Sequence, residues 1–345
     1  MKYTTLPHSD IKVSKLCLGT MTWGNQNTQE EGFEQMNYAV EQGINFFDTA
    51  ELYPVPAQES TYAETERIIG KWLKQTGKRE DIVLASKIAG TGDYTAHIRT
   101  NGFAPEAIES AIENSLKRLQ TDYIDLFQLH WPERESNFFG TRDYKHNPND
   151  PWEDNFNEVL NSLDKAIQAG KIRNIGISNE KAWGAMRYLE ESKYNAMPRM
   201  KTIQNSYSLI NRGFETDLAE IAMREGLGLL AYSPMAFGVL SGKYVEGLAN
   251  ENSRLNLYPR FSRYSSVNCT KAVTQYLQVA KDHGLSLAQM SLAFVTQQPF
   301  VTSNIIGASK MEQLKENIAS IEVDLTEEII AEINKIHEDI PNPAT

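Results

Sequence analysis

Cysteine is scarce in this sequence. Its 345 residues include two cysteines, Cys17 and Cys269, which are too few for a disulfide scaffold. Neither belongs to a Cys-x-x-Cys motif or to a Cys/His cluster with metal-ligand spacing. The sequence therefore predicts neither a disulfide framework nor a metal site. It fits a reducing compartment, and we expect a cytoplasmic protein.

Long apolar runs and an excess of positive charge are also missing. No apolar run approaches the roughly 20 residues of a membrane-spanning helix, and residues 1–19 lack the apolar stretch of a signal peptide. Lys and Arg number 34 against 45 Asp and Glu, so the net charge is −11. Sequence-independent binding to nucleic acid needs a basic surface that displaces counterions from phosphates. We therefore expect no membrane span and no nucleic-acid partner.

Short β-like runs alternate with longer segments of helical periodicity. Helices are expected at 30–43, 65–77, 105–120 and 157–171, several of them ending in the glycine that often caps a helix. The interval 233–302 holds two helical patterns and leaves room for an extra helix. The eight expected strands are residues 16–19, 44–48, 82–87, 123–130, 172–178, 201–204, 227–232 and 303–307.

Eight strands that alternate with helices predict an α/β fold of the (β/α)8 TIM-barrel type. With 41% hydrophobic residues, the chain can bury a large core. No linker or low-complexity stretch divides it, so we expect residues 1–345 to form a single barrel domain. Long loops at 90–103 and 133–154 are expected over the C-terminal face of the barrel.

Polar side chains stand at the ends of three predicted strands. Asp48, Lys87 and His130 end the second, third and fourth strands, and Tyr53 lies on the loop after Asp48. Because the C-terminal strand ends form the active-site face of a barrel, these four groups are expected to meet at its mouth. Each alone also fits a helix cap, a surface ion pair or an ordinary buried polar residue, but together they favour an active site. Glu51, in the same stretch, is interpreted as a loop carboxylate without a chemical role.

A series of sequence blocks, in order along the chain, resembles the aldo-keto reductase family. The similarity covers nearly the whole chain, and the spacing of the blocks is nearest to the Tas-like branch, which is also similar to the β subunits of voltage-gated potassium channels. The blocks are FDTAELY (47–53), LASK (84–87), QLHWP (128–132), GKIRNIGISN (170–179), TIQNSYSLINR (202–212), LLAYSPMAFGVLSGKY (229–244) and IIGASKMEQLKENI (305–318).

The resemblance implies a metal-free reductase of small-molecule carbonyls that uses NADP(H), with a catalytic tetrad of Asp48, Tyr53, Lys87 and His130. Hydride addition to a carbonyl leaves an alkoxide, which needs a proton. Tyr53 is the expected donor. Lowering a phenol pKa from about 10 to about 7 takes about 4 kcal/mol. Lys87 would supply this, Asp48 would hold Lys87, and His130 would orient the carbonyl or relay the proton.

The cofactor must bind without a Rossmann fingerprint, because no Gly-x-Gly-x-x-Gly follows a predicted strand. The family instead lays an extended dinucleotide across the barrel mouth. The resemblance implies that Ser178, Asn179 and Gln204 hold the carboxamide, that Tyr232 stacks on the nicotinamide, and that residues 233–243 follow the pyrophosphate. The full set of expected cofactor residues is Gly19, Thr20, Met21, Asp48, Ser178, Asn179, Gln204, Tyr232, Ser233, Pro234, Met235, Gly238, Leu240, Lys243, Arg254, Gly307, Ser309, Lys310, Gln313, Glu316 and Asn317.

The substrate is expected to contact Trp23, Tyr53, His130 and Trp131. Phe138 and Phe139 fit either an aromatic lining or packing of their loop against the barrel.

The polar segment 244–265 contains Arg254, Arg260 and Arg263. We expect a mobile loop there that orders over the pyrophosphate when the cofactor binds.

Three functions remain open at this stage. The first is an NADPH-dependent carbonyl reductase. The second is a nucleotide-binding regulatory protein that senses redox state, similar to channel β subunits, which retain the same tetrad. The third is an unrelated barrel enzyme such as an isomerase, in which the block matches are accidental. The complete tetrad favours the first over the third. The physiological substrate, the direction of the reaction and the oligomeric state do not follow from the sequence.

Overall fold

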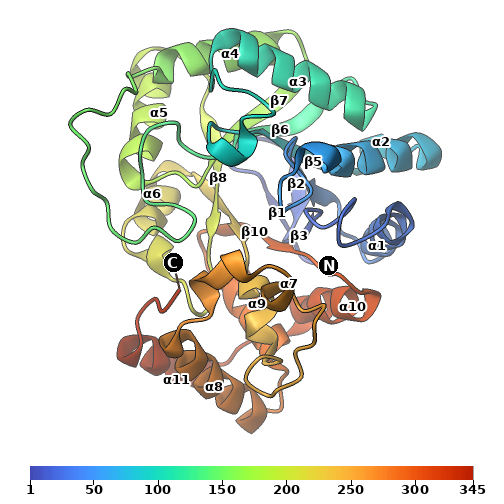
Figure 1. Ribbon diagram of the computed structural model, residues 1–345, viewed down its shortest axis with the longest axis vertical. Helices are drawn as coiled ribbons and strands as arrows, with labels where there is room; N and C mark the ends of the chain where they lie inside the picture. The colour runs from blue at the N-terminus through green and yellow to red at the C-terminus, as the bar shows by residue number, and fades with distance from the viewer. Residues whose placement is uncertain (345) are drawn as a thin grey trace.

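Eight parallel strands close into a barrel in the computed structural model, which describes residues 1–344 apart from the side chain of Arg260 (Figure 1). The barrel order is β10, β3, β4, β5, β6, β7, β8, β9, so consecutive strands are neighbours and the last closes on the first. The predicted (β/α)8 fold is confirmed. The strands are β3 (Leu16–Gly19), β4 (Phe46–Asp48), β5 (Val83–Ile88), β6 (Ile124–Leu129), β7 (Ile172–Ser178), β8 (Met200–Ser206), β9 (Gly228–Tyr232) and β10 (Val301–Ile306).

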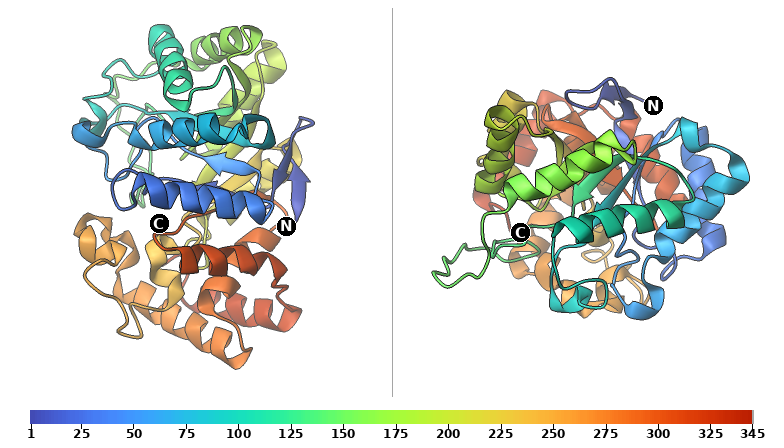
Figure 2. Two further views of the ribbon diagram at one scale, coloured as in Figure 1. Left: turned by 90° about the vertical axis from the view of Figure 1, so that its right-hand side faces the viewer. Right: turned by 90° about the horizontal axis from the view of Figure 1, so that it is seen from above.

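Helices follow the strands and form the outer ring, as the views in Figure 2 show. Several start and stop where the sequence provides caps: Thr28 and Glu31 form a capping box on the first helix, and Gly77 ends the second in a left-handed conformation. The ring helices are α1 (Gln29–Glu41), α2 (Glu64–Thr76), α3 (Pro105–Leu119), α4 (Phe156–Gln168), α5 (Ala182–Tyr194), α6 (Leu218–Glu225), α9 (Leu287–Gln297) and α10 (Met311–Ala319).

Three further helices lie outside the simple alternation. They are α7 (Arg254–Leu257), α8 (Val267–Asp282) and α11 (Glu327–Asp339). The two helical patterns expected within 233–302 correspond to α8 and α9, and α8 is the extra helix. It packs against α11, and both lie at the lower end of the view in Figure 1.

A short hairpin at the N-terminus was not expected. β1 (Tyr3–Thr5) pairs antiparallel with β2 (Lys12–Ser14). Val13 packs with Cys17, Phe46 and Leu230 inside the barrel, so the hairpin closes its N-terminal end. Strands of three residues give too short an alternation to be recognised in the sequence.

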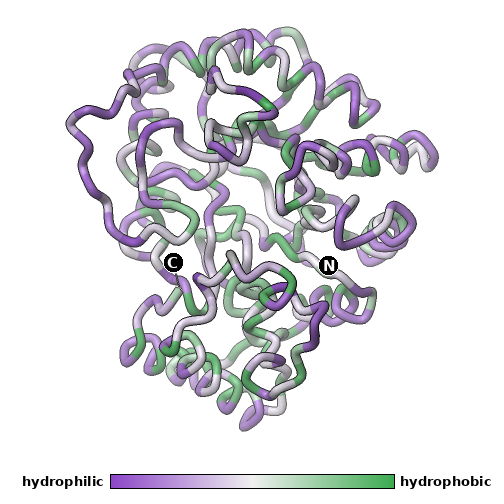
Figure 3. The backbone as a smooth tube through the Cα atoms, in the orientation of Figure 1, coloured by the Kyte–Doolittle hydropathy of each residue, from purple (hydrophilic) through white to green (hydrophobic). Residues whose placement is uncertain are grey.

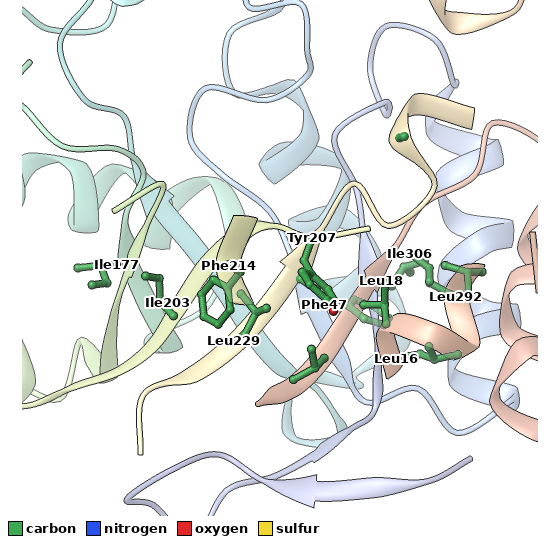
Figure 4. Close-up of a cluster of buried hydrophobic side chains, with 14 of the residues drawn as sticks. Leu16, Leu18, Phe47, Ile177, Ile203, Tyr207, Phe214, Leu229, Leu292 and Ile306 are labelled. Carbon is green, nitrogen blue, oxygen red and sulfur yellow. The ribbon is translucent and has the colours of Figure 1, made fainter. Parts of the chain in front are cut away.

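The hydrophobic core has two parts, one inside the barrel and a larger one between strands and helices. Figure 4 shows the larger cluster, in which Leu18, Phe47 and Leu229 from different strands lie among side chains such as Tyr207 and Leu292. Figure 3 colours the backbone by hydropathy, and polar residues are prominent on the outer helices. In the described part of the chain, no helix combines the length and apolar character that crossing a membrane requires.

Two long loops at the C-terminal ends of the strands are held by carboxylates. Glu51 is fully buried and forms an ion pair with Arg99 of the loop 90–103, while its Oε1 also accepts the Ala89 N–H at 2.6 Å. Glu133 accepts Phe103 N–H at 2.7 Å and the Asn155 amide at 2.8 Å, which joins the two loops. Glu51 thus holds the loop 90–103 in place above the barrel mouth, and its side chain is buried.

Candidate active site

A buried ion pair lies at the bottom of the barrel mouth. Lys87, at the end of β5, has no exposed surface, and its Nζ donates hydrogen bonds of 2.7 Å to Asp48 Oδ2 and 2.7 Å to the backbone oxygen of Thr49. The Asp48 side chain is 3% exposed. Burial alone would lower the pKa of Lys87, but Asp48 and the nearby Tyr53 phenol outweigh that effect and raise it. The amine is therefore a fixed cation.

Two glutamines hold the other oxygen of Asp48. Gln204 Nε2 on β8 donates to Asp48 Oδ1 at 2.8 Å, and Gln128 Nε2 on β6 donates to the same atom at 3.3 Å. Side chains of four strands therefore meet at one carboxylate. Gln128 was not among the expected site residues, although a signal existed: it lies two residues before His130, and alternate residues of a strand point to the same face.

Tyr53 lies directly above this pair. Its ring centroid is 5.0 Å from Lys87 Nζ, and the residue is 9% exposed. Burial raises the pKa of Tyr53 above its ordinary value; the Lys87 charge opposes this and Asp48 supports it, so the net direction is upward. The expectation that Lys87 lowers the pKa of Tyr53 is therefore wrong for the protein without cofactor. Burial would strip the phenolate of its water, and Asp48 offsets the charge of Lys87.

His130 completes the tetrad. Its ring centroid is 5.8 Å from that of Tyr53 and 4.9 Å from that of Trp131. Burial and the Lys87 charge hold the pKa of His130 well below its ordinary value. The ring is therefore neutral at pH 7 and carries one N–H donor. Its Nδ1 is buried and has no hydrogen-bond partner among the described residues.

A cavity of about 690 Å³ opens above the tetrad. The tetrad residues Asp48, Tyr53 and His130 line it, as does Trp131, while Lys87 lies behind them. Nineteen of the 21 expected cofactor residues line the same cavity: Gly19, Thr20, Met21, Asp48, Ser178, Asn179, Gln204, Tyr232, Ser233, Pro234, Met235, Gly238, Lys243, Arg254, Gly307, Ser309, Gln313, Glu316 and Asn317.

Three expected residues lie elsewhere. Trp23 has no exposed surface, and its Nε1 donates to Gln35 at 3.1 Å beneath α1, so it is a core residue and the substrate role expected of it is corrected. Leu240 is likewise fully buried in the hydrophobic core and does not line the cavity. Leu240 lies in a motif block, where an inward and an outward side chain look alike in the sequence. Lys310 is exposed and does not line the cavity, although its charge helps to lower the pKa of Lys243.

The expected nicotinamide end of the cavity has a preorganised polar wall. Asn179 Nδ2 donates to the backbone oxygen of His130 at 2.8 Å and to Ser178 Oγ at 3.1 Å, and the Tyr232 hydroxyl donates to Asn179 Oδ1 at 2.6 Å. Asn179 and Ser233 both adopt left-handed backbone angles, with φ of 55° and 53°. Such angles are uncommon outside glycine and mark a backbone shaped by its surroundings.

Aromatic residues from both long loops reach the cavity. Tyr94 of the loop 90–103 and Phe139 of the loop 133–154 line it, and the Trp131 ring lies 5.6 Å from Tyr94 and 5.8 Å from Phe139, centroid to centroid. Phe138 packs edge-on against Phe139 at 5.1 Å and does not line this cavity. Phe139 therefore lines this cavity, whereas Phe138 packs against the cluster of Tyr53 and Trp131 and lines the neighbouring cavity.

This barrel with a buried Asp–Lys–Tyr–His cluster defines the class of protein. The profile of the Aldo/keto reductase family matches residues 15–338, and the chain belongs to that family, whose members generally use NAD(P)H.

Individual relatives agree with this assignment. The chain is 46% identical to protein tas of Escherichia coli (strain K12) over the full length of both chains. It is 33% identical to the uncharacterized oxidoreductase YrpG of Bacillus subtilis (strain 168), over 97% of this chain and 96% of the relative. It is 30% identical to the norsolorinic acid reductase stcV of Emericella nidulans, over 95% of this chain and 79% of the relative. The expected branch of the family is thereby confirmed.

The neutral state of His130 leads to a prediction about pH. The imidazole signals of His130, assigned with His130→Gln, are expected not to titrate between pH 8 and pH 6. His283 is the internal control, since its hydrogen bond to Glu332 raises its pKa and it should titrate in this range. Protonation of both rings together near pH 6.5 would contradict the buried, neutral His130.

The lowered pKa of His130 also makes the free energy of unfolding depend on pH. Below pH 6.5 an unfolded chain protonates this histidine and the folded chain does not, so acidification favours unfolding by at most about 1.4 kcal/mol per pH unit until the folded pKa is reached. Denaturant unfolding between pH 6.5 and pH 5 should therefore show a shallower loss of stability in His130→Gln than in the parent.

Proposed function

We propose that this protein reduces aldehyde or ketone carbonyls to alcohols with NADPH, and that Tyr53 is the proton donor. The observation that carries the proposal is the buried Asp48–Lys87 pair directly beneath the Tyr53 ring, at the floor of a cavity large enough for a cofactor and a substrate. The names of two relatives, the norsolorinic acid reductases of Emericella nidulans and Dothistroma septosporum, support reduction as the reaction type.

A protonated Tyr53 suits this reaction. The alkoxide that forms as a carbonyl is reduced is a far stronger base than a phenolate, so a neutral phenol protonates it even when its own pKa is raised. The Lys87 ammonium then stabilises the phenolate left behind, and Asp48 keeps that ammonium in place. The neutral His130 has one ring N–H with which it can orient the carbonyl oxygen.

The residues around the cavity fit a nicotinamide dinucleotide. Bound NADPH would supply the hydride for the carbonyl carbon. Tyr232 offers a ring for stacking, and Gln204 has an amide oxygen that accepts no hydrogen bond from the described residues, which suits a carboxamide N–H. Gly238 has φ of 86°, and a Cβ there would lie 3.1 Å from Lys243 Nζ, so glycine keeps the backbone and this amine accessible to a phosphate.

The cations of the cavity support a preference for NADPH over NADH. Burial lowers the pKa of Lys243, and the charge of Lys310 lowers it further. A phosphate dianion nearby would stabilise the charged form of Lys243 against both effects. Ser309 lies in the same part of the cavity lining. One charge-assisted hydrogen bond contributes about 1.5–3 kcal/mol, so two would give a preference of about a hundredfold or more.

Fluorescence titration tests this preference. The dissociation constant for NADPH should be about a hundredfold below that for NADH, and Lys243→Met should reduce the difference at least tenfold while changing NADH binding little. Lys271→Met, at an exposed lysine of α8, is the matched control and should behave as the parent. Equal constants for the two cofactors in the parent would rule out the NADP assignment.

The segment 244–265 crosses the cavity as a strap. Arg254 is 8% exposed, its Nη1 donates to Gln26 Oε1 at 3.1 Å, and the Tyr258 hydroxyl donates to Asn25 Oδ1 at 3.3 Å. These contacts join the segment to the loop after β3 on the opposite rim. Tyr264 is buried in the core, but the other described apolar side chains of the segment are half-buried or exposed. We expect the segment to open for cofactor exchange and to close over the bound pyrophosphate.

Limited proteolysis would detect this movement. Cleavage within 244–265 is expected to be rapid in the cofactor-free protein and at least tenfold slower with saturating NADPH, because the closed strap resists local opening. Cleavage elsewhere in the chain serves as the internal control. A rate at 244–265 that NADPH leaves unchanged would show that the strap does not close over the cofactor.

The tetrad makes a graded prediction for turnover. Tyr53→Phe removes one hydroxyl, keeps the ring, and should lower carbonyl reduction by roughly 10²- to 10⁴-fold with little change in NADPH affinity. Lys87→Met should also abolish most activity, because the phenolate would lose its stabilising charge. Asp48→Asn should retain more activity than Lys87→Met, because it loosens the amine without removing it.

Steady-state kinetics over a panel of aldehydes, ketones and quinones measures these effects, and NADPH titration of each variant controls for folding. If Tyr53→Phe reduces carbonyls within about threefold of the parent while chemistry is rate-limiting, another group is the acid. If the parent binds NADPH but reduces no member of the panel, the carbonyl-reductase proposal fails.

A further inference from the structure

A second cavity lies beside the active-site cavity, and we call it the side cavity. Its volume is about 940 Å³, and it is bounded by the segment 133–154, the start of α5 and the loops after β7 and β8. The segment 133–154 is the long green loop at the left of Figure 1. Phe139, Gly140, Asn179, Tyr232 and Arg263 line both cavities. The two spaces therefore share one boundary, next to the residues expected to hold the nicotinamide.

The charge of the side cavity differs from that of the whole protein. Four cationic side chains line it among the described residues, Arg134, Arg142, Lys181 and Arg263, against the three carboxylates of Glu135, Asp150 and Asp217. The chain as a whole carries a net charge of −11. With the Glu180 carboxylate that pairs with Arg134 the charges here are balanced, so an anion that most of the surface repels meets no net negative charge at this cavity.

Most of these charges have partners within the protein. Arg134 forms an ion pair with Glu180, and Arg142 Nη2 donates to the backbone oxygen of Pro343 at 2.8 Å. The Lys181 amine is different, since it makes no hydrogen bond or ion pair with any described residue. Burial lowers the pKa of Lys181, although the more distant charges of Asp217 and Glu180 oppose this. A partly dehydrated ammonium without a direct partner is stabilised by an anion.

Two further groups lie at this end of the cavity. Lys181 is the N-cap of α5, its side chain makes no capping hydrogen bond, and Ala182 and Trp183 of the first turn line the cavity, so the positive end of the helix dipole lies there. The Glu180 carboxylate lies at the same helix end, where it accepts the Lys181 N–H at 2.6 Å. Asn205 lines the cavity as well. It is 7% exposed, and its Oδ1 is buried with no hydrogen-bond partner among the described residues. Asn205 Nδ2 donates to the Glu180 backbone oxygen at 2.9 Å, so only the amide oxygen lacks a partner, and it suits an N–H or O–H donor of a water or of the ligand body rather than a carboxylate.

Aromatic side chains provide the remaining walls. Phe139, Trp183 and Phe214 line the cavity, and Phe139 and Trp183 are exposed by 44% and 53%. Exposed rings around a polar cavity provide apolar contact area for a planar or aliphatic ligand. The side cavity therefore combines an apolar lining with a cationic end.

We propose that the side cavity binds the far end of an extended carbonyl substrate that carries a carboxylate, and that Lys181 selects for this carboxylate. The proposal rests on the reductase function above. The carbonyl would lie at Tyr53 and His130, the body of the substrate would pass Phe139, and the carboxylate would pair with the Lys181 amine. Lys181 is thus a specificity-determining residue, and it takes no part in the chemistry.

A series of aldehydes of increasing length tests this assignment. The substrates are ω-(4-formylphenoxy)alkanoic acids with one to eight methylene groups, each compared with its neutral carboxamide. At the length that reaches Lys181, the parent should show a kcat/KM for the acid at least tenfold above that for the amide, mainly through KM, and added salt should reduce this preference. Lys181→Met should abolish or reverse the preference, and Lys181→Arg should restore it. Lys193→Met, at an exposed lysine of the same helix, should leave every rate unchanged.

Calorimetry with the corresponding phenoxyalkanoic acids, which lack the aldehyde, gives a readout that does not depend on turnover. Tighter binding of acids than of amides in the parent, but not in Lys181→Met, would support the site. If no aldehyde were reduced as well, that failure would overturn only the proposed function. If aldehydes are reduced but acids and amides do not differ at any length, the side cavity is not an anion site. A preference that survives in Lys181→Met excludes Lys181 as its cause.

Discussion

The Asp48–Lys87 ion pair is the constraint on which the rest of the site depends. A fully buried ammonium is tolerated only where a carboxylate and further hydrogen bonds replace its water, and here Asp48 Oδ2 and the Thr49 carbonyl do so. Asp48 in turn needs Gln204 and Gln128 on its other oxygen. One pair therefore ties together the ends of four strands. It also places a fixed positive charge beneath the Tyr53 ring.

The charges around Tyr53 do not lower the pKa of its phenol. A single lysine next to a tyrosine would lower the pKa of the phenol, but the Asp48 carboxylate offsets the lysine charge and burial makes the phenolate costly. The phenol stays protonated, as the proposed proton donor must, and in that proposal the ammonium acts on the anion only once it forms. Burial and the Lys87 charge likewise keep His130 neutral. The neutral ring has one N–H, which is available to a carbonyl oxygen.

Carboxylates also organise the loops that define what enters the mouth. Glu51, Glu133 and Glu180 each hold a segment of the upper face through an arginine or a backbone N–H. The charges of Glu51 and Glu180 are each paired with an arginine. The Lys181 amine differs from these groups, because it makes no hydrogen bond or ion pair with any described residue, whereas Arg134 beside it is paired with Glu180.

The sequence by itself determined the barrel and the tetrad. Each barrel strand is a short apolar run, and Asp48, Lys87 and His130 mark strand ends, which parallel barrel geometry necessarily gathers at one face. The sequence did not show which way a side chain points within a motif block. Leu240 points into the core and Gln128 points to Asp48, and Trp23, outside these blocks, is also a core residue. Tertiary structure alone decided these orientations, together with the pKa directions of Tyr53 and His130 and the existence of the side cavity. Burial and charge pairing depend on residues distant in the chain, and local sequence carries no record of them.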